Sequence, residues 1–451
     1  MWLTARSVGA FCFILLALSS PPILFADDPG DAAPVLTLNN AIQIAIANNR
    51  PLQISSLEVN KSKWQVASAK TKRLPIINTY LFASGNLNSP SFTFPRDLFG
   101  PVNGSPVPAK DVSVQLSSGV TGNAYVQIAQ PISQLYKVHL YVREQELSGD
   151  HTSQEYRAAR QNVVSDVKQA YYAVLQTESA LDAAQVTVKQ YEETDRISLQ
   201  YVSQEVVLKS ESLEVKAKLA QSQYEVVQLN NNLQTQKEHL NDLMGRDIET
   251  PFRTEQVPTE TVEEIDLKVA QQAALSQRPE LKEAEINVQK ADYDRRLAKA
   301  QYIPDVSAAF HYLTPINTSI LPQNIVAAGM EFSWDPFDWG QRRDEVKQKS
   351  ITVEQSQIQL KQTQSKILLD VNNHFRKLQE SRQLLGVAQA ARDASNEKLR
   401  EVNDKFKQQT VLLRDVLQQQ TSVANSEHDY EQALLSFWSA KAEFEKALGE
   451  E

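Results

Sequence analysis

The side chains that most often carry catalysis or bind metals are few and scattered in this sequence. Six histidines occur without an HExxH motif or another paired spacing of metal ligands, namely His139, His151, His239, His311, His374 and His428. Cys12 is the only cysteine, so we expect no disulfide, thiolate nucleophile or Cys-ligated metal after the N-terminal segment. A glycine-rich phosphate-binding loop is also missing, which excludes a transport ATPase. We therefore expect neither an enzyme nor a cofactor nor a metal centre.

The charged residues favour a structural role over a binding one. The formal net charge of −9 gives no argument for nucleic acid as a partner. One mixed cluster, Asp335, Asp338, Arg342 and Arg343, follows an alternating segment and precedes a long helical pattern. We expect these four side chains to form ion pairs at the junction of a strand and a helix.

The elements that position these residues follow one succession of motifs that occurs twice. Each copy runs from a short helical pattern through strands into a long helix, and three prolines punctuate it: Pro51, Pro75 and Pro131 in the first copy, Pro279, Pro304 and Pro336 in the second. Internal repeats dictate architecture. We therefore place a first repeat at 27–245, a linker at 246–264 and a second repeat at 265–451.

The N-terminus has the pattern of a secretory signal. Arg6 precedes an apolar run from Ala10 to Ala17, and Ala26 stands before two aspartates. The run is shorter than the ~20 residues that a membrane-spanning helix needs. We expect residues 1–26 to be a signal peptide rather than an anchor. No other stretch approaches a spanning helix, so any insertion into a membrane must use strands.

Two long segments, 136–245 and 340–449, have the composition of helical hairpins. Both are rich in Gln, Glu, Ala, Lys, Leu and Val. In the first, apolar residues recur at every seventh position, at Val167, Val174, Leu181 and Val188. This spacing predicts a seam for a neighbouring helix. A helix of ~60 residues is about 90 Å long, roughly three times the hydrocarbon thickness of a bilayer. Gly245 and Gly449 are expected to end the two hairpins.

Short segments alternate apolar and polar residues, at Ile76 to Ser84, Val112 to Leu116, Val306 to Tyr312 and Met330 to Trp334. We interpret 75–131 and 304–337 as β-hairpins, the first with a long loop at 86–110 that is rich in Pro, Gly and Ser. An apolar outer face and a polar inner face are typical of outer-membrane barrels, although a half-buried soluble sheet gives the same pattern. Six aromatic residues are candidates for the girdles of such a barrel: Tyr80, Tyr125, Tyr312, Trp334, Phe337 and Trp339.

The number of strands bears on the oligomeric state. Four strands cannot close a barrel in lipid, where every edge must be paired, and single-chain barrels have at least eight strands. If these strands span a membrane, several copies of the chain must share one barrel. The sequence then requires a homo-oligomer but does not fix its order.

This layout resembles the TolC family of outer-membrane efflux factors over essentially the whole chain after the signal segment. The resemblance is carried by Leu38-Asn-Asn-Ala41, Asn48-Asn-Arg50-Pro51, Gln277-Arg-Pro-Glu280-Leu281, Leu74-Pro75, Ile303-Pro304, Gln130-Pro131 and Asp335-Pro336-Phe337-Asp338-Trp-Gly340. Family membership implies an α+β membrane fold with two internal repeats, long α-helical coiled-coil hairpins and four β-strands per chain in a shared trimeric 12-stranded β-barrel. It also implies that the linker 246–264 lies in an equatorial region.

The resemblance implies a passive exit duct rather than a pump. Such a homotrimer sits in the lipid of the outer membrane of a Gram-negative-type cell, with its helical barrel in the periplasm. It works with a periplasmic adaptor (membrane fusion) protein and an inner-membrane transporter, in tripartite efflux or in type I secretion.

Asp415 is the candidate pore constriction. The segment from Arg414 to Gln418 resembles the family's tip segment, in which an inward ring of aspartates narrows the pore. Three converging carboxylates favour cations and disfavour anions. The alternative is a plain structural role, because an acidic residue suits the start of a helix. The glycine common at the family's tips is replaced by Gln204 and Gln409, so the family's detailed lock is not carried over.

Four apolar tip residues are candidates for adaptor contact: Val207, Leu208, Leu412 and Leu413. Their alternative role is packing within the tip turns.

The alternative function is that of a soluble periplasmic coiled-coil adaptor or structural interaction protein. An adaptor would place lipoyl-like and β-barrel halves around one helical hairpin. This chain has two helical hairpins, each preceded by its own pair of strands, and that order favours the channel.

Overall fold

The computed structural model describes residues 34–85, 87, 91–115, 119–204, 208–257, 266–317, 322–408, 410–411 and 413–450. The expected signal peptide at 1–26 and the linker residues 258–264 lie outside the described residues.

The chain is built from two matching series of elements. The first comprises α1 (Leu38–Asn48), α2 (Arg50–Thr71), β2 (Ile76–Gly85), β7 (Val120–Pro131), α3 (Gln134–Ser203) and α4 (Lys209–Leu243). The second comprises α5 (Leu267–Gln277), α6 (Pro279–Ala300), β9 (Asp305–Ile316), β10 (Ile325–Ser333), α7 (Gln341–Lys407) and α8 (Leu413–Leu448). The two series correspond element by element, so the repeated motifs of the sequence mark repeated structure.

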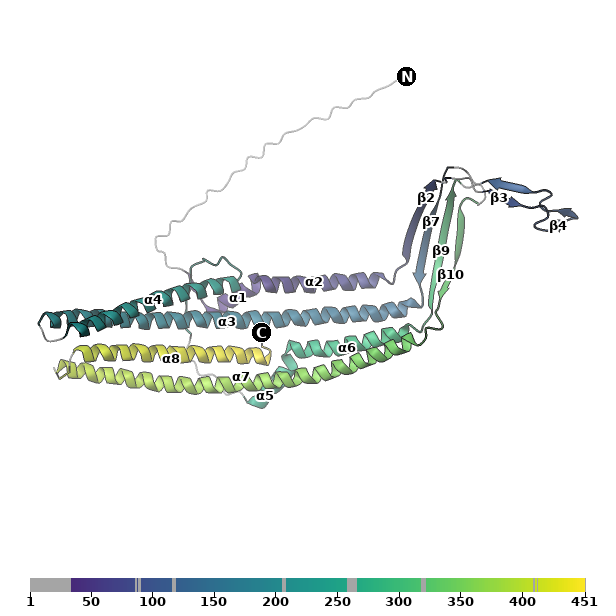
Figure 1. The fold of residues 1–451 in the computed structure, drawn as a ribbon. Coiled ribbons are helices and arrows are strands. Elements are labelled where there is room, and N and C mark those ends of the chain that lie inside the picture. Colours follow the sequence, from purple (N-terminus) through teal and green to yellow (C-terminus); the bar gives the residue numbers. More distant parts are fainter. Residues whose placement is uncertain are drawn as a thin grey trace, which may run out of the picture.

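The helices form an elongated layer of four rows, with the sheet at one end (Figure 1). One outer row holds α2 and α4 end to end, and this row packs on α3. On its other side α3 packs on a row formed by α6 and α8, which in turn packs on α7. The rows α3 and α7 are therefore continuous helices, and each lies beside a row that is made of two shorter ones.

In each row that is made of two helices, the junction between them lies at an arginine–proline motif. These motifs are Arg50-Pro51 at the start of α2 and Arg278-Pro279 at the start of α6. In the first repeat Asn49 caps α2 by accepting a hydrogen bond from the backbone N–H of Leu52 at 3.0 Å. Its amide nitrogen donates to the carbonyl of Leu243, at the end of α4, at 2.8 Å. In the second repeat Arg278 donates to the carbonyl of Ala447, near the end of α8, at 3.3 Å. Helix ends leave carbonyls without partners, and these side chains supply the missing donors.

Gly245 and Gly449 end the paired helices, as predicted. Their φ angles are +68° and +86°, in the left-handed region that favours glycine at a helix C-terminus. Gly245 thus ends its hairpin directly beside the start of α2, and Gly449 ends its hairpin directly beside the start of α6.

The main core lies where two short strands pack beside α3. These strands are β1 (Val35–Leu36) and β8 (Arg253–Thr254), which pair in parallel. Tyr171 is only 1% exposed, and its hydroxyl donates to the carbonyl of Leu36 at 2.8 Å while it accepts from the N–H of Glu255, also at 2.8 Å. One side chain of α3 thus joins the N-terminal segment to the described part of the linker.

The predicted seam of α3 is buried from Val167 to Leu181 and half-buried at Val188. Val167 and Val174 are fully buried, and Leu181 is 9% exposed. The small residues Ala170 and Ala184 alternate with them and are also buried. Small side chains at these positions let the neighbouring helices approach closely.

Four of the strands form one antiparallel sheet in the order β10-β9-β7-β2. The two hairpins are joined by β7 and β9, so β2 and β10 are the edges. One sequence expectation about this sheet needs correction. The segment Val112–Gln115 (β6) does not belong to this sheet, because it pairs with Ser91–Phe94 (β3). The strand that occupies its expected place is β7.

The expected loop at 86–110 contains ordered strands. Besides β3, it holds Pro101–Val102 (β4) paired with Ser105–Pro106 (β5). These two short hairpins form an arm that extends beyond the end of the sheet (Figure 1). The second repeat has no such arm between β9 and β10 among its described residues.

Candidate functional site

The pairing register gives the four-stranded sheet one apolar face. Residues directly opposite each other in antiparallel strands point to the same side. Val126 faces Thr79 on one neighbour and Tyr312 on the other, and Met330 faces Ala308. Extending this register gives an apolar face that includes Ile77, Leu81, Val126, Ile128, Val306, Phe310, Val326, Met330 and Phe332.

Most of these apolar side chains are exposed, whereas Val126, Ile128 and Val306 on the central strands are half-buried. Leu81 is 78% exposed, Met330 64% and Phe332 65%. A contiguous exposed apolar surface marks contact with a membrane or a protein partner. This face of the sheet is therefore suited to contact with an apolar environment.

The opposite face of the sheet holds most of its polar side chains, although Phe82 and Leu313 also lie there. It carries Asn78, Tyr80, Asn123, Tyr125, Gln127, Ser307, His311 and Glu331. Tyr80 and Tyr125, which were expected in an aromatic girdle, lie here instead, with ring centroids 6.0 Å apart. Their expected place in the girdle was wrong, because the register turns them to the polar side.

Four of these residues form a hydrogen-bonded chain across β7, β9 and β10. The hydroxyl of Tyr125 lies 2.6 Å from Nδ1 of His311, and Nε2 of His311 lies 3.2 Å from Oε1 of Glu331. Gln127 donates from Nε2 to the same oxygen of Glu331 at 2.9 Å. With a proton on Nε2, His311 accepts from Tyr125 and donates to Glu331. All donors in the chain then point toward one carboxylate.

The outer helical rows carry many of the exposed large apolar side chains of the helical layer, and α3 carries others, among them Tyr136 and Leu199. On α2 and α4 these are Ile54, Leu57, Trp64, Leu213, Tyr224 and Val227, and on α7 they are Ile351, Ile358, Leu369, Leu384 and Val387. Within the described chain, α6 and α8 expose no large apolar side chain in this way. The two outer rows are the opposite edges of the layer (Figure 1). Both edges therefore present apolar side chains.

The tip residues lie at the end of the layer farthest from the sheet (Figure 1). Asp415 lies in the first turn of α8 and is partly exposed. Leu208 directly precedes α4 and is 69% exposed. Leu413 is the first residue of α8. Val207 and Leu412 lie outside the described residues. The structure thus brings Asp415 and Leu208 to the same end of the layer.

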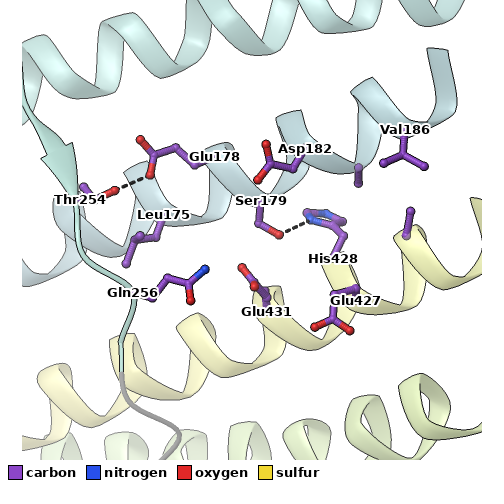
Figure 2. A pocket seen from close by; sticks show the side chains of 12 residues that line it. Leu175, Glu178, Ser179, Asp182, Val186, Thr254, Gln256, Glu427, His428 and Glu431 are labelled. Carbon is purple, nitrogen blue, oxygen red and sulfur yellow. Dashed lines mark hydrogen bonds between the residues drawn. The ribbon is translucent and has the colours of Figure 1, made fainter. Parts of the chain in front are cut away.

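A polar cavity of about 350 Å³ lies between α3 and α8, next to β8 (Figure 2). Its charged lining consists of Glu178, Asp182, Glu427, His428 and Glu431. Nδ1 of His428 lies 3.3 Å from the hydroxyl of Ser179, and the hydroxyl of Thr254 donates to Glu178 (Figure 2).

The cavity does not have the geometry of a metal centre. Among the residues that the structure describes, no three or more His, Cys, Asp or Glu side chains are grouped so as to hold a metal ion. Glu178 is instead paired with Lys237 of α4 at 2.8 Å. The cavity is a polar pocket at the contact between α3 of the first repeat and α8 of the second.

The charged cluster at the strand-to-helix junction forms only one of the expected kind of ion pair. Arg342 pairs with Asp338 at 3.2 Å, and Asp338 also accepts hydrogen bonds from the backbone N–H groups of Gly340 and Arg342. These bonds, first of all that from Arg342, lower the pKa of Asp338. Arg343 pairs with Asp344 rather than with Asp335 or Asp338. The cluster caps the start of α7.

No helix in the described part of the chain is long and apolar enough to cross a bilayer.

An elongated helical layer made of two repeats, joined to a four-stranded sheet with one apolar face, is the fold of TolC-like channel subunits. The chain belongs to the outer membrane efflux protein family, whose model matches residues 41–246 and 270–450. The resemblance drawn from the repeated motifs is thereby confirmed.

Solved structures with the same fold include the following three. The CmeC outer membrane channel of Campylobacter jejuni matches with a TM-score of 0.74 at 16% identity, over 91% of this chain and 85% of that one. The outer membrane protein VceC of Vibrio cholerae matches with a TM-score of 0.70 at 15% identity, over 92% and 96%. The MtrE outer membrane channel of Neisseria gonorrhoeae matches with a TM-score of 0.68 at 16% identity, over 92% and 89%. No curated protein sequence matches the chain.

Proposed function

We propose that the chain is the protomer of a trimeric outer-membrane channel, the passive exit duct of a tripartite efflux or type I secretion system. The observation that carries this proposal is the sheet, with its exposed apolar face, its polar face and its two open edges. Strand edges in lipid must be paired, because no water is available to bond their backbone groups. The edge β10 of one copy and the edge β2 of the next supply partners for each other.

The helical layer supports the same head-to-tail arrangement. One of its apolar outer rows consists of α2 and α4, and the other is α7. When copies are placed side by side, the first row of one copy lies next to the second row of its neighbour. A contact between different surfaces of identical chains closes into a ring when the rotation between copies allows it. The family resemblance sets the ring at three copies, which gives twelve strands from four per chain.

The tips at the far end of the layer are the proposed contact for a periplasmic adaptor, which couples the duct to an inner-membrane transporter. Leu208 is available for this contact, because it directly precedes α4 and is 69% exposed. The duct itself moves nothing against a gradient. In this proposal the energy comes from the transporter.

The first test is the size and conductance of the detergent-extracted protein. A trimer that gives discrete conductance steps in a planar bilayer supports the channel. A chain that is monomeric or dimeric and stays soluble without detergent overturns the proposal and favours the soluble coiled-coil adaptor.

Engineered disulfides test the ring directly. Ile54 on α2 and Ile358 on α7 lie at similar distances along their helices from the sheet, on the two outer rows. These rows are separated by α3 and α6 within one chain, so an Ile54→Cys, Ile358→Cys variant can crosslink only between copies. Oxidation is expected to give covalent dimers and trimers on a denaturing gel. As the matched control, Ile54→Cys with Leu384→Cys places the second thiol far along α7 and is expected to stay monomeric.

A further inference from the structure

The four strands contain very few formal charges. Among their described residues the only carboxylates are Asp305 and Glu331, and no lysine or arginine occurs. Asp305 at the start of β9 is neutralised by Lys137 of α3, with 2.6 Å between Nζ and Oδ1. Glu331 is therefore the one carboxylate in the described part of these strands that has no lysine or arginine partner.

Glu331 lies on the polar face and is held in a defined position. Its Oε1 accepts from Gln127 at 2.9 Å and contacts His311 at 3.2 Å, while Tyr125 fixes the other side of the imidazole. The rings of Tyr125 and His311 are also stacked, with centroids 5.8 Å apart. The side chain of Glu331 nevertheless keeps 47% of its surface exposed. It is a preorganised carboxylate that still faces water.

We infer that Glu331 forms an acidic ring on the inner wall of the barrel, which makes the strand section of the duct prefer cations to anions. This inference rests on the proposed trimeric channel, which brings three copies of the polar face around one lumen. A ring of carboxylates gives a pore cation preference. Glu331 lies two residues before the end of β10 that leads to α7, so the ring lies near the helical end of the barrel.

The preference is expected to depend strongly on salt. Charges on the wall act over the Debye length, which is about 10 Å at 0.1 M and about 3 Å at 1 M salt. A ring in a wide lumen therefore affects permeation clearly in dilute salt and little in concentrated salt. Selectivity through the ring is distinct from any effect at the tip, because the β10–α7 junction and the start of α8 lie at opposite ends of the helical layer (Figure 1).

The test is the reversal potential of the full-length channel in planar bilayers under a potassium chloride gradient. Glu331→Gln keeps the volume and the acceptor oxygen for Gln127 and His311 but removes the charge. Around 0.1 M salt it is expected to lower the potassium-to-chloride permeability ratio about twofold or more, with little effect near 1 M. Glu331→Asp, which keeps the charge, is expected to retain most of the wild-type ratio.

The measurement is made with the wild-type tip and again with Asp415→Asn, so that a narrow tip cannot mask the strand section. A lower ratio for Glu331→Gln in either background supports the ring. An unchanged ratio in both backgrounds, with trimers of normal size, overturns it. A wild-type protein without any conductance would instead count against the proposed channel.

Discussion

Gly245 at the end of α4 lies directly against the backbone of Asn48 at the end of α1. A Cβ atom on Gly245 would come within 2.2 Å of the carbonyl oxygen of Asn48, which is closer than any real contact. The close approach allows α4 and α2 to share one row, because the chain leaves α4 at the point where α2 begins. The glycine and the asparagine–arginine–proline motif are thus two halves of one junction.

Gly245→Ala is expected to destabilise this junction by about 2 kcal/mol or more. The φ angle of +68° is unfavourable for alanine, and the clash with Asn48 adds to that cost. Thermal unfolding followed by the helical circular dichroism signal measures the effect. The matched control is Gly386→Ala in the middle of α7, where no heavy atom lies within 4 Å of the added Cβ. That change is expected to stabilise by roughly 0.5–1 kcal/mol. Equal melting temperatures for Gly245→Ala and wild type would contradict the junction.

Tyr171→Phe is expected to loosen the attachment of β1 and β8 to α3. The substitution removes the hydroxyl that bridges Leu36 and Glu255, and it leaves two backbone groups unsatisfied in a buried place. Burial also raises the pKa of Tyr171 to about 12, which keeps the hydroxyl protonated at any physiological pH. A loss of about 1–3 kcal/mol is expected.

The control for Tyr171 is Tyr172→Phe, on the same helix and also buried. The described part of the chain provides no hydrogen bond to the Tyr172 hydroxyl, so its removal is expected to cost less. Amide hydrogen exchange at β1 and β8 gives a local measurement. Exchange there is expected to accelerate in Tyr171→Phe and to stay unchanged in Tyr172→Phe. The opposite order would show that the bridge does not hold the two strands.

The repeats and the helical hairpins could be predicted from the sequence, because each has a local signal. Prolines, capping glycines and the seven-residue spacing of Val167 and Val174 depend only on neighbours along the chain. The partners of strands do not have such a signal. Alternation correctly marked 112–115 as a strand, but only the fold shows that it pairs with β3 in the arm rather than with β2.

The chain from Tyr125 to Glu331 illustrates the same limit at the level of side chains. His311 and Glu331 each occupy a polar position in an alternating segment, so their side of the sheet was visible in the sequence. Their contact was not, because it depends on the register of three strands. Tyr125 lies on β7, the strand that alternation failed to single out, since Gly122, Asn123 and Ala124 interrupt the pattern.

Glu283 on α6 is expected to make stability depend on pH. Burial first of all, together with the nearby carboxylates of Glu155 and Glu280, raises its pKa from 4.5 to about 7. The groups around it include His151, which pairs with Glu155 at 3.5 Å, and Arg278, which pairs with Glu280 at 2.9 Å. The facing residues of α7 in this region are uncharged, among them Thr352, Ser356 and Gln359.

The sign follows from the direction of the shift. The folded state holds the proton of Glu283 more tightly than the unfolded state, so its contribution to stability is present below about pH 4.5 and is lost as the pH rises toward 7. Because Glu283 is only partly buried, the loss is discounted for solvent screening to the order of 1 kcal/mol. Glu283→Gln is expected to melt higher than wild type at pH 8 and at nearly the same temperature at pH 4.5. A difference that is equal at both pH values would remove Glu283 as the cause.

Asp415→Asn is expected to reduce cation selectivity at the tip, if the three copies of Asp415 point into the pore. The structure places Asp415 in the first turn of α8, where a carboxylate also stabilises the helix through its dipole. The two roles separate by experiment. A pore role lowers the potassium-to-chloride permeability ratio in planar bilayers while Asp415→Glu retains it, whereas a purely helical role lowers the melting temperature and leaves the ratio unchanged. Combined with Glu331→Gln, the two losses in selectivity are expected to add when expressed as free energies, because sites this far apart share no contacts.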